Sequence, residues 1–199
     1  MTRPLPFAVL VSGSGRSLDN LAAVIAAGNL DAEIRLVVSD RPGITALERA
    51  ERLGLEHVVL PWREYGGPDG FSRKVFEEIE ARGCELVVLA GFLRLLKLPP
   101  AWRGRVLNIH PALLPKYGGK GFYGDRVHRA VIESGDTKSG CTVHIVDEVY
   151  DQGEILLQRE VPVLPEDDPK TLAARVFAEE KRALPEAIRL FAARESRSL

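Results

Sequence analysis

Short apolar runs alternate along the chain with longer stretches in which apolar residues recur at helical spacing. The short runs are rich in β-branched residues and predict buried strands at 7–11, 34–38, 57–60, 85–89 and 105–109. The intervening stretches predict helices at 17–27, 44–53 and 71–82. This β-α-β-α order is typical of a Rossmann-like α/β fold, in which helices cover both faces of a mostly parallel, twisted sheet.

The second half of the chain follows a different order. It predicts a helix at 125–133, strands at 140–146 and 154–161, and a closing helix at 169–193. Asp168 and Pro169 supply a helix cap and a first-turn proline, whereas Pro185 should kink or break the helix. The tail from 194 to 199 should fray. Without a repeat or linker, the sequence favours one domain, 1–199, with an N-terminal part of about 7–104 and a C-terminal part of about 105–193.

The composition of the chain indicates which kinds of binding partner to expect. Lys and Arg total 27 against 28 Asp and Glu, so no net field favours nucleic acid or an anionic membrane, and small-molecule substrates are expected. Cys84 and Cys141 lack metal-site spacing and favour buried free thiols, and the four histidines form no zinc pattern. The chain has no 18-residue apolar run, and its first six residues lack the apolar core of a signal peptide, which predicts a cytoplasmic protein.

The end of the strand at 105–109 carries the first candidate chemistry. Asn108 and His110 are two residues apart and face the same way in a strand, and Pro111 then ends the ladder. An amide donor beside an imidazole suits stabilisation of an oxyanion and acid–base catalysis. The alternative is a strand end whose side chains merely satisfy a turn.

A glycine-rich junction follows the first strand. Gly13, Ser14, Gly15, Arg16 and Ser17 lead directly into a helix, where backbone N–H groups and the helix N-terminus favour an anion such as a phosphate. Dinucleotide binding and simple turn chemistry remain alternatives. Asp40 stands where a ribose-binding acid would lie, but Leu18 occupies the position of the third glycine of that fingerprint.

The third cluster lies late in the chain. A strand carries His144, and a loop with Asp147, Glu148 and Asp151 follows. Solvated acids are the simpler interpretation of Asp147 and Glu148. Asp151 precedes a glycine at Gly153 that permits a tight loop, and it is a candidate to orient the imidazole of the second cluster.

Taken together, these clusters resemble the glycinamide ribonucleotide formyltransferase family. The motifs occur in the family's order over nearly the whole chain: SGSG at 12–15, LAGFLR at 89–94, NIHPALLPK at 108–116, TVH at 142–144 and DQG at 151–153. The resemblance implies transfer of a formyl group from 10-formyltetrahydrofolate to the amine of glycinamide ribonucleotide in purine biosynthesis, with no metal. It also implies that Asn108 and a protonated His110 stabilise the tetrahedral oxyanion while Asp151 supports His110 and proton transfer.

The resemblance implies binding residues as well. The N-terminal part would bind the ribonucleotide phosphate, and the C-terminal part would carry the catalytic and folate-site loops. Residues matching the ribonucleotide site are Gly13, Ser14, Gly15, Arg16, Ser17, Arg73, Pro111 and Glu180. Residues matching the folate site are Leu89, Phe92, Leu93, Arg94, Leu96, Val146 and Val149, and His128 and His144 would support the site. Without the resemblance, a solvated Arg73, a Glu180 paired with Arg175 or Lys181, and core leucines are simpler interpretations.

Two departures from the family pattern affect this transfer of roles. Arg16 and Ser17 replace the commoner Ser-Asn, and the glycine-rich segment 118–124 is longer than in many relatives. Four glycines in that segment suggest a mobile flap. Oligomeric state, monomer or homodimer, is left open.

Three functions therefore compete. The first is the glycinamide ribonucleotide transferase. The second is another member of the group, such as a formyltetrahydrofolate hydrolase or a transferase acting on methionyl-tRNA or an amino sugar. We expect this chain to lack the N-terminal regulatory domain of the hydrolase and the C-terminal domain of the tRNA enzyme, and the glycine loop favours a phosphorylated small acceptor. The third is a non-catalytic nucleotide-binding module.

Overall fold

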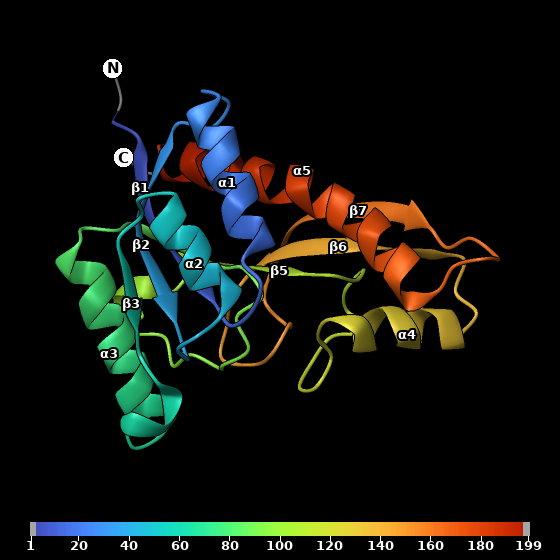
Figure 1. The fold of residues 1–199 in the computed structure, drawn as a ribbon, viewed down its shortest axis with the longest axis horizontal. Helices are drawn as coiled ribbons and strands as arrows, with labels where there is room; N and C mark the ends of the chain where they lie inside the picture. The colour runs from blue at the N-terminus through green and yellow to red at the C-terminus, as the bar shows by residue number, and fades with distance from the viewer. Residues whose placement is uncertain (1–2, 197–199) are drawn as a thin grey trace. The chain divides into compact units, whose positions relative to one another are not determined.

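The structure is a computed structural model that describes residues 3–196. Its strands form a sheet in the order β3-β2-β1-β4-β5-β6-β7 (Figure 1), which confirms the predicted α/β fold. The chain divides into two compact units, the first ending at Leu107 and the second beginning at Asn108.

The first unit is a parallel βα repeat. Its elements are β1 (Leu5–Val11), α1 (Arg16–Ala26), β2 (Ala32–Ser39), α2 (Thr45–Arg52), β3 (His57–Val59), the 3-10 turn η1 (Trp62–Glu64), α3 (Pro68–Ala81), β4 (Leu86–Leu89) and the 3-10 turn η2 (Pro100–Trp102). β1 pairs in parallel with both β2 and β4, so the strand order reverses beside β1. Right-handed crossovers then place α1 and α2 on one face and α3 on the other. The carboxyl end of β1 is the switch point at which such sheets bind ligands.

The sequence explains most boundaries in this unit. β1 is buried from Pro6 to Val11, as a strand covered on both faces requires. α3 begins at Pro68, three residues before the predicted start at Phe71. The earlier start follows from proline chemistry, because Pro68 occupies the first turn, where its missing N–H costs nothing.

The second unit starts within β5 (Val106–His110) and contains α4 (Asp125–Glu133), β6 (Lys138–Ile145), β7 (Ile155–Pro162) and α5 (Pro169–Glu195). β6 and β7 form an antiparallel pair, and α5 packs along both of them (Figure 1). Asp168 caps α5 as predicted, since its Oδ1 accepts hydrogen bonds from the N–H groups of Lys170 and Thr171, both at 2.8 Å.

Of the predicted kink or break at Pro185, the break is wrong, because α5 is helical from Pro169 to Glu195, and the kink stays a prediction. Pro185 is buried together with Leu184, Ala187 and Ile188. Burial of this apolar face offsets the loss of one backbone hydrogen bond. Helical residues 194 and 195 also differ from the predicted frayed tail, of which 197–199 lie outside the described residues.

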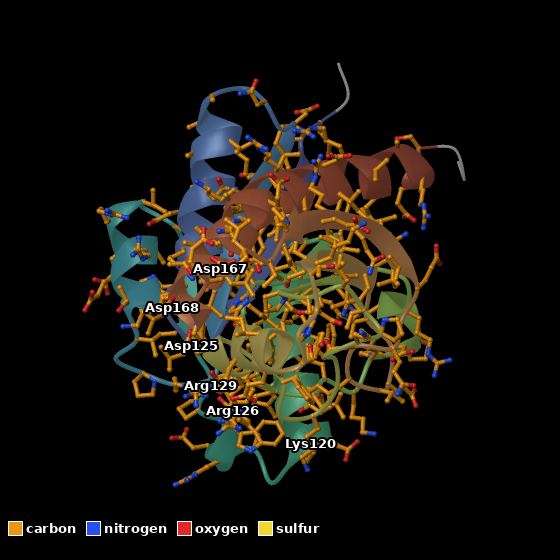
Figure 2. The ribbon with its side chains drawn as sticks, turned by 90° about the vertical axis from the view of Figure 1, so that its right-hand side faces the viewer. Lys120, Asp125, Arg126, Arg129, Asp167 and Asp168 are labelled. Carbon is orange, nitrogen blue, oxygen red and sulfur yellow. The ribbon has the colours of Figure 1, made fainter. Side chains whose placement is uncertain are left out.

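The surface of the second unit mixes charges of both signs. Lys120, Asp125, Arg126 and Arg129 lie around the start of α4, and Asp167 and Asp168 lie at the start of α5 (Figure 2). Within residues 3–196, no helix is long and apolar enough to cross a membrane.

Both cysteines are buried free thiols, as predicted. Burial raises the pKa of Cys84 to about 11 and that of Cys141 to about 12, so both stay protonated at neutral pH.

Candidate active site

The loop after β1 is tied to the loop after β4 in the first unit. The Ser12 N–H donates to the Gly91 carbonyl at 3.2 Å, and the Leu93 N–H donates to the Ser12 hydroxyl at 3.0 Å. These bonds fix the start of the predicted phosphate loop at the switch point of the sheet.

The two loop glycines differ in what they do. Gly15 has a φ of 73°, and a Cβ there would lie 2.7 Å from the Cβ of Ala46, so only glycine allows α1 to begin this close to α2. A Cβ on Gly13 would meet nothing within 4 Å. Gly13 and Ser14 are exposed and the Ser14 carbonyl accepts from Arg49 Nε at 2.8 Å. Contacts with Ala46 and Arg49 of α2 thus hold one side of the loop, whereas Gly13 and Ser14 are exposed at the N-terminus of α1. This geometry favours an anion.

Asp40 does not act as the ribose acid of a dinucleotide site. Its side chain is fully buried and accepts from Arg94 Nε at 2.7 Å and from Arg41 Nη2 at 3.0 Å. Burial opposes its ionisation, but the Arg41, Ser12 and Arg94 hydrogen bonds outweigh that effect and lower its pKa. A carboxylate already used by two guanidinium groups is poorly placed to bind ribose hydroxyls, which disfavours the dinucleotide alternative.

The other predicted binding residues of the first unit divide into exposed and buried sets. Arg73 and Ser17 lie on helices, and the Arg73 side chain is 78% exposed, with Glu77 3.9 Å away. Arg94 also lies over the Trp62 ring at 5.2 Å. Leu89, Phe92 and Leu96 are buried and Leu93 is half-buried. In the protein without ligand, Arg73 is thus a largely exposed helix residue, and Leu89 and Leu96 are core residues.

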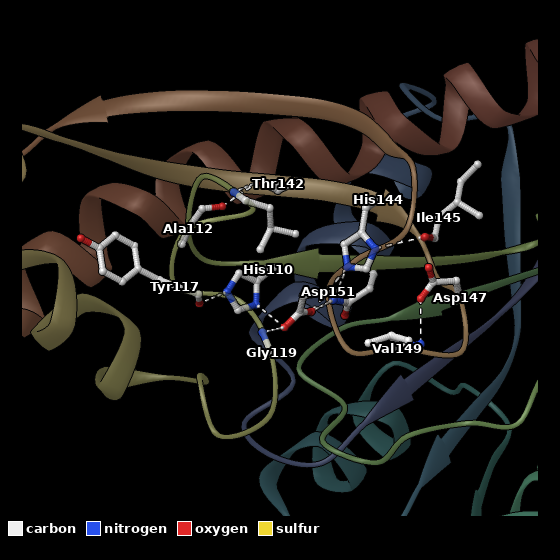
Figure 3. A network of polar contacts seen from close by, with 12 residues as sticks. His110, Ala112, Tyr117, Gly119, Thr142, His144, Ile145, Asp147, Val149 and Asp151 are labelled. Carbon is white, nitrogen blue, oxygen red and sulfur yellow. Dashed lines mark hydrogen bonds and ion pairs between the residues drawn. The ribbon is translucent and has the colours of Figure 1, made fainter.

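The second unit brings the predicted catalytic residues together (Figure 3). Asn108 Nδ2 lies 3.0 Å from His144 Nε2 and 3.2 Å from Asp151 Oδ1. His110 Nδ1 lies 3.6 Å from Asp151 Oδ2. The sequence suggested Asp151 as the acid that orients His110, and the structure brings these two side chains together.

Hydrogen-bond chemistry assigns the protons of this network. His110 Nε2 lies 2.7 Å from the Tyr117 carbonyl, which can only accept, so Nε2 carries a proton. His144 Nδ1 lies 3.1 Å from the Ile145 carbonyl, so its Nε2 is left to accept from Asn108. Asn108 thereby donates one amide hydrogen to His144 and the other to Asp151.

The charges of the pair are set by burial and contact. The His110 side chain is 5% exposed, and desolvation lowers its pKa although the Asp151 charge acts the other way. For Asp151, burial raises the pKa, but its hydrogen-bond donors outweigh that effect and lower the pKa, among them the Gly119 N–H at 2.8 Å. His110 is therefore neutral and Asp151 ionised in the free protein near pH 7. The expectation that His110 is protonated while it stabilises the oxyanion concerns the reacting complex and stays a prediction.

Asp151 is held in an unusual backbone conformation. Its φ is 56°, a left-handed value that is uncommon outside glycine. Its Oδ2 accepts from the Gly119 N–H at 2.8 Å, which ties the loop after β6 to the segment after β5. Asp147 instead accepts from the Val149 N–H at 2.8 Å, as a loop acid closing its own turn.

The remaining predicted residues of this unit lie outside that network. Val146 and Pro111 are half-buried, Val149 is half exposed, and His128 is buried on α4. Glu180 is half-buried on α5, and its charge contributes to the raised pKa of Cys141. Arg175, one predicted alternative partner of Glu180, pairs with Asp167. Among the described residues, no group of three or more His, Cys, Asp and Glu is arranged to hold a metal ion.

Two backbone groups in the network were missed from the sequence, namely the Tyr117 carbonyl and the Gly119 N–H. Main-chain groups are identical at every position, so residue types cannot reveal them. The run of glycines after Tyr117 was the only available signal. A Cβ on Gly118 would lie 2.6 Å from Leu114 Cδ2 and 3.2 Å from Asp151 Cβ, whereas one on Gly121 or Gly124 would meet nothing within 4 Å. The start of segment 118–124 is thus packed against the site, and mobility of the rest stays a prediction.

Comparison with known proteins identifies the family. A profile described as formyl transferase matches residues 5–188. The chain belongs to the formyl transferase family. Curated members similar to it include the trifunctional purine biosynthetic protein adenosine-3 of Drosophila pseudoobscura pseudoobscura, 40% identical over 189 residues, which cover 93% of this chain and 14% of that protein. The chloroplastic phosphoribosylglycinamide formyltransferase of Arabidopsis thaliana is 39% identical, with 91% of this chain and 63% of that protein covered. The chain thus spans less than two thirds of the length of these relatives.

Solved structures of the formyl transferase family show the same fold. Glycinamide ribonucleotide transformylase 1 from Symbiobacterium toebii matches with a TM-score of 0.90 and 38% identity, covering 97% of this chain and 90% of that one. Phosphoribosylglycinamide formyltransferase from Brucella melitensis matches with a TM-score of 0.86 and 34% identity, covering 96% of both chains.

Proposed function

We propose that this formyltransferase moves the formyl group of 10-formyltetrahydrofolate to the amine of glycinamide ribonucleotide, in the cytoplasm and without a metal ion. The observation that carries the proposal is the buried network of Asn108, His110 and Asp151 in a chain of this family. The similar solved structures are glycinamide ribonucleotide formyltransferases by name, which supports this acceptor.

The chemistry requires an oxyanion donor and a route for one proton. The neutral amine of the acceptor attacks the formyl carbon, a C–N bond forms, and the carbonyl electron pair moves onto oxygen. The His110 Nε2–H stabilises that oxygen when the oxygen replaces the Tyr117 carbonyl as its acceptor. When the adduct collapses, the bond from carbon to the folate nitrogen breaks, and that nitrogen gains the proton which the amine loses.

Asp151 supports this charge change. Its Oδ2 faces Nδ1 of His110 at 3.6 Å, so a proton taken up at Nδ1 would form an ion pair in a buried site. The imidazole is thus neutral at rest and is stabilised as a cation when the adduct carries negative charge. Asn108 stabilises the same oxygen only if the oxygen replaces one of its two acceptors, of which Asp151, at 3.2 Å, is the more distant.

The acceptor's phosphate binds the loop of Gly13, Ser14, Gly15, Arg16 and Ser17, with Arg73 as a further cation. Open backbone at a helix N-terminus supports this role for the loop. Residues 89–96, Val146 and Val149 bind the folate, Glu180 and Pro111 contact the ribonucleotide, and His128 and His144 support the site. These assignments rest on the family match.

The test is formyl transfer from 10-formyltetrahydrofolate with and without glycinamide ribonucleotide. We expect turnover that depends on the acceptor and is lost in His110→Gln but kept in the control His57→Gln, which alters a half-buried histidine of β3. Turnover without acceptor would instead identify a hydrolase. Absence of turnover would support a non-catalytic module.

A further inference from the structure

Tyr117 has a strained backbone at the point where it meets His110. Its φ is 56°, a value that costs energy for a residue with a bulky side chain. Its carbonyl accepts from His110 Nε2 at 2.7 Å (Figure 3). Such strain persists only where surrounding contacts hold it, so the contacts of Tyr117 need an explanation.

Polar contacts hold the Tyr117 side chain at its hydroxyl group. The hydroxyl lies 2.7 Å from Asp136 Oδ2 and 2.5 Å from Ser134 Oγ. Lys116 Nζ also binds Asp136, at 2.9 Å, and lies over the Tyr117 ring at 5.9 Å. A pocket of about 230 Å³ borders Tyr117, Lys116 and Asp136, so packing on that side is incomplete. The ring of Phe122 lies beside the Tyr117 ring, with centroids 6.5 Å apart, so the hydroxyl bonds and this ring contact together hold the side chain.

The position of the Tyr117 carbonyl decides which His110 nitrogen carries the proton. A neutral imidazole has one proton, and two charged or titratable side chains, Asp151 and His144, act on the ring. Without the carbonyl, the Asp151 carboxylate facing Nδ1 would draw the proton to Nδ1 and leave Nε2 as an acceptor. An acceptor at Nε2 would repel a developing oxyanion instead of stabilising it.

We propose that Tyr117 is a positioning residue, whose hydroxyl anchor on Asp136 and Ser134 holds its carbonyl where it keeps the resting proton of His110 on Nε2. The catalytic consequence rests on the proposed function, whereas the tautomer itself does not. The side chain of Tyr117 thus acts on the reaction through its own backbone.

The test compares Tyr117→Phe with Tyr65→Phe, since Tyr65 follows η1 in the first unit and its ring packs against Phe71. The ¹⁵N chemical shifts of the His110 ring report the tautomer, and steady-state kinetics report kcat and both KM values. In Tyr117→Phe we expect both neutral tautomers and a fall in kcat of about 10-fold, the effect of weakening one hydrogen bond to a charged group. Both KM values should stay within about twofold, because substrate contacts are kept. Tyr65→Phe should match wild type.

A folded Tyr117→Phe with wild-type kcat and a pure Nε2–H tautomer would overturn the proposal. If Tyr117→Phe fails to fold, Asp136→Ala removes the other end of the anchor and is judged by the same two readouts. If the wild-type protein transfers no formyl group, the proposed function fails, and the ¹⁵N shifts still decide the role of Tyr117.

Discussion

The two candidate sites of this protein differ in the chemical groups that form them. In the first unit the proposed phosphate loop consists of open main chain at a helix N-terminus, and the nearby carboxylate of Asp40 forms ion pairs with Arg41 and Arg94. In the second unit the network consists of buried side chains, with His110 5% and Asp151 10% exposed. Binding an anion requires only donors and partial charge, which backbone supplies. Moving a proton requires titratable groups whose pKa values the surroundings adjust.

This comparison predicts that the largest loss of turnover comes from the second unit. Asp151→Asn should lower kcat by about 100-fold to 1,000-fold, because it removes the charge that supports His110. It should also lower stability by about 1–3 kcal/mol, since the new amide turns a donor toward either the Asn108 amide or the Gly119 N–H. Kinetics and denaturant unfolding measure the two effects.

Asp147→Asn is the matched control, an acid of the same loop that closes a turn at Val149. It should keep turnover near wild type. Equal losses in the two variants would mean that the loop, and not the Asp151 charge, matters for the reaction.

A smaller effect, on binding, should come from the first unit. Gly15→Ala forces a Cβ to within 2.7 Å of the Ala46 Cβ at a φ of 73°. We expect a loss of about 1–3 kcal/mol in the free energy of unfolding and a rise of about tenfold in the acceptor's KM as the loop shifts. Gly13→Ala should leave stability within about 0.5 kcal/mol of wild type, since its Cβ meets only open space. A large change in kcat with an unchanged acceptor KM in Gly15→Ala would erase the distinction between the two sites.

The smallest effect should come from Arg73. Because its side chain is 78% exposed, Arg73→Ala should cost little stability. The acceptor's KM should rise about fivefold while that of the folate stays unchanged, as expected for loss of one exposed phosphate contact. Lys74→Ala, which removes the neighbouring partner of Glu78, is the control. A rise in the folate KM alone would move Arg73 to the other substrate.

Periodicity predicted the elements of the fold because each strand and helix buries its apolar residues with a recognisable spacing. The same logic placed Asn108 beside His110, which are neighbours on one strand. Pro185 was the exception, since local chemistry argued for a break and tertiary burial of Leu184 and Ile188 prevailed.

The proton positions could not be predicted in the same way. They depend on the depth of burial of His110, on the left-handed backbone of Tyr117 and Asp151, and on two main-chain groups. None of these features can be inferred from the residue types in the sequence. Arg94 is similar, because its pairing with Asp40 joins residues 54 positions apart.

The central claim is that His110 and Asp151 form the proton-handling pair, and the titration of the His110 imidazole tests it most directly. Followed by NMR in the wild-type protein, the ring should titrate below the ordinary histidine pKa, since burial favours its neutral form. Folding stability from this group should accordingly be fully present above the ordinary histidine pKa and be lost progressively as pH falls from that value through the lower pKa of the folded protein, because the unfolded chain takes up the proton first. In Asp151→Asn the titration should move lower still, because the charge that raises it is gone. An unmoved titration together with near-wild-type turnover in that variant would contradict the account.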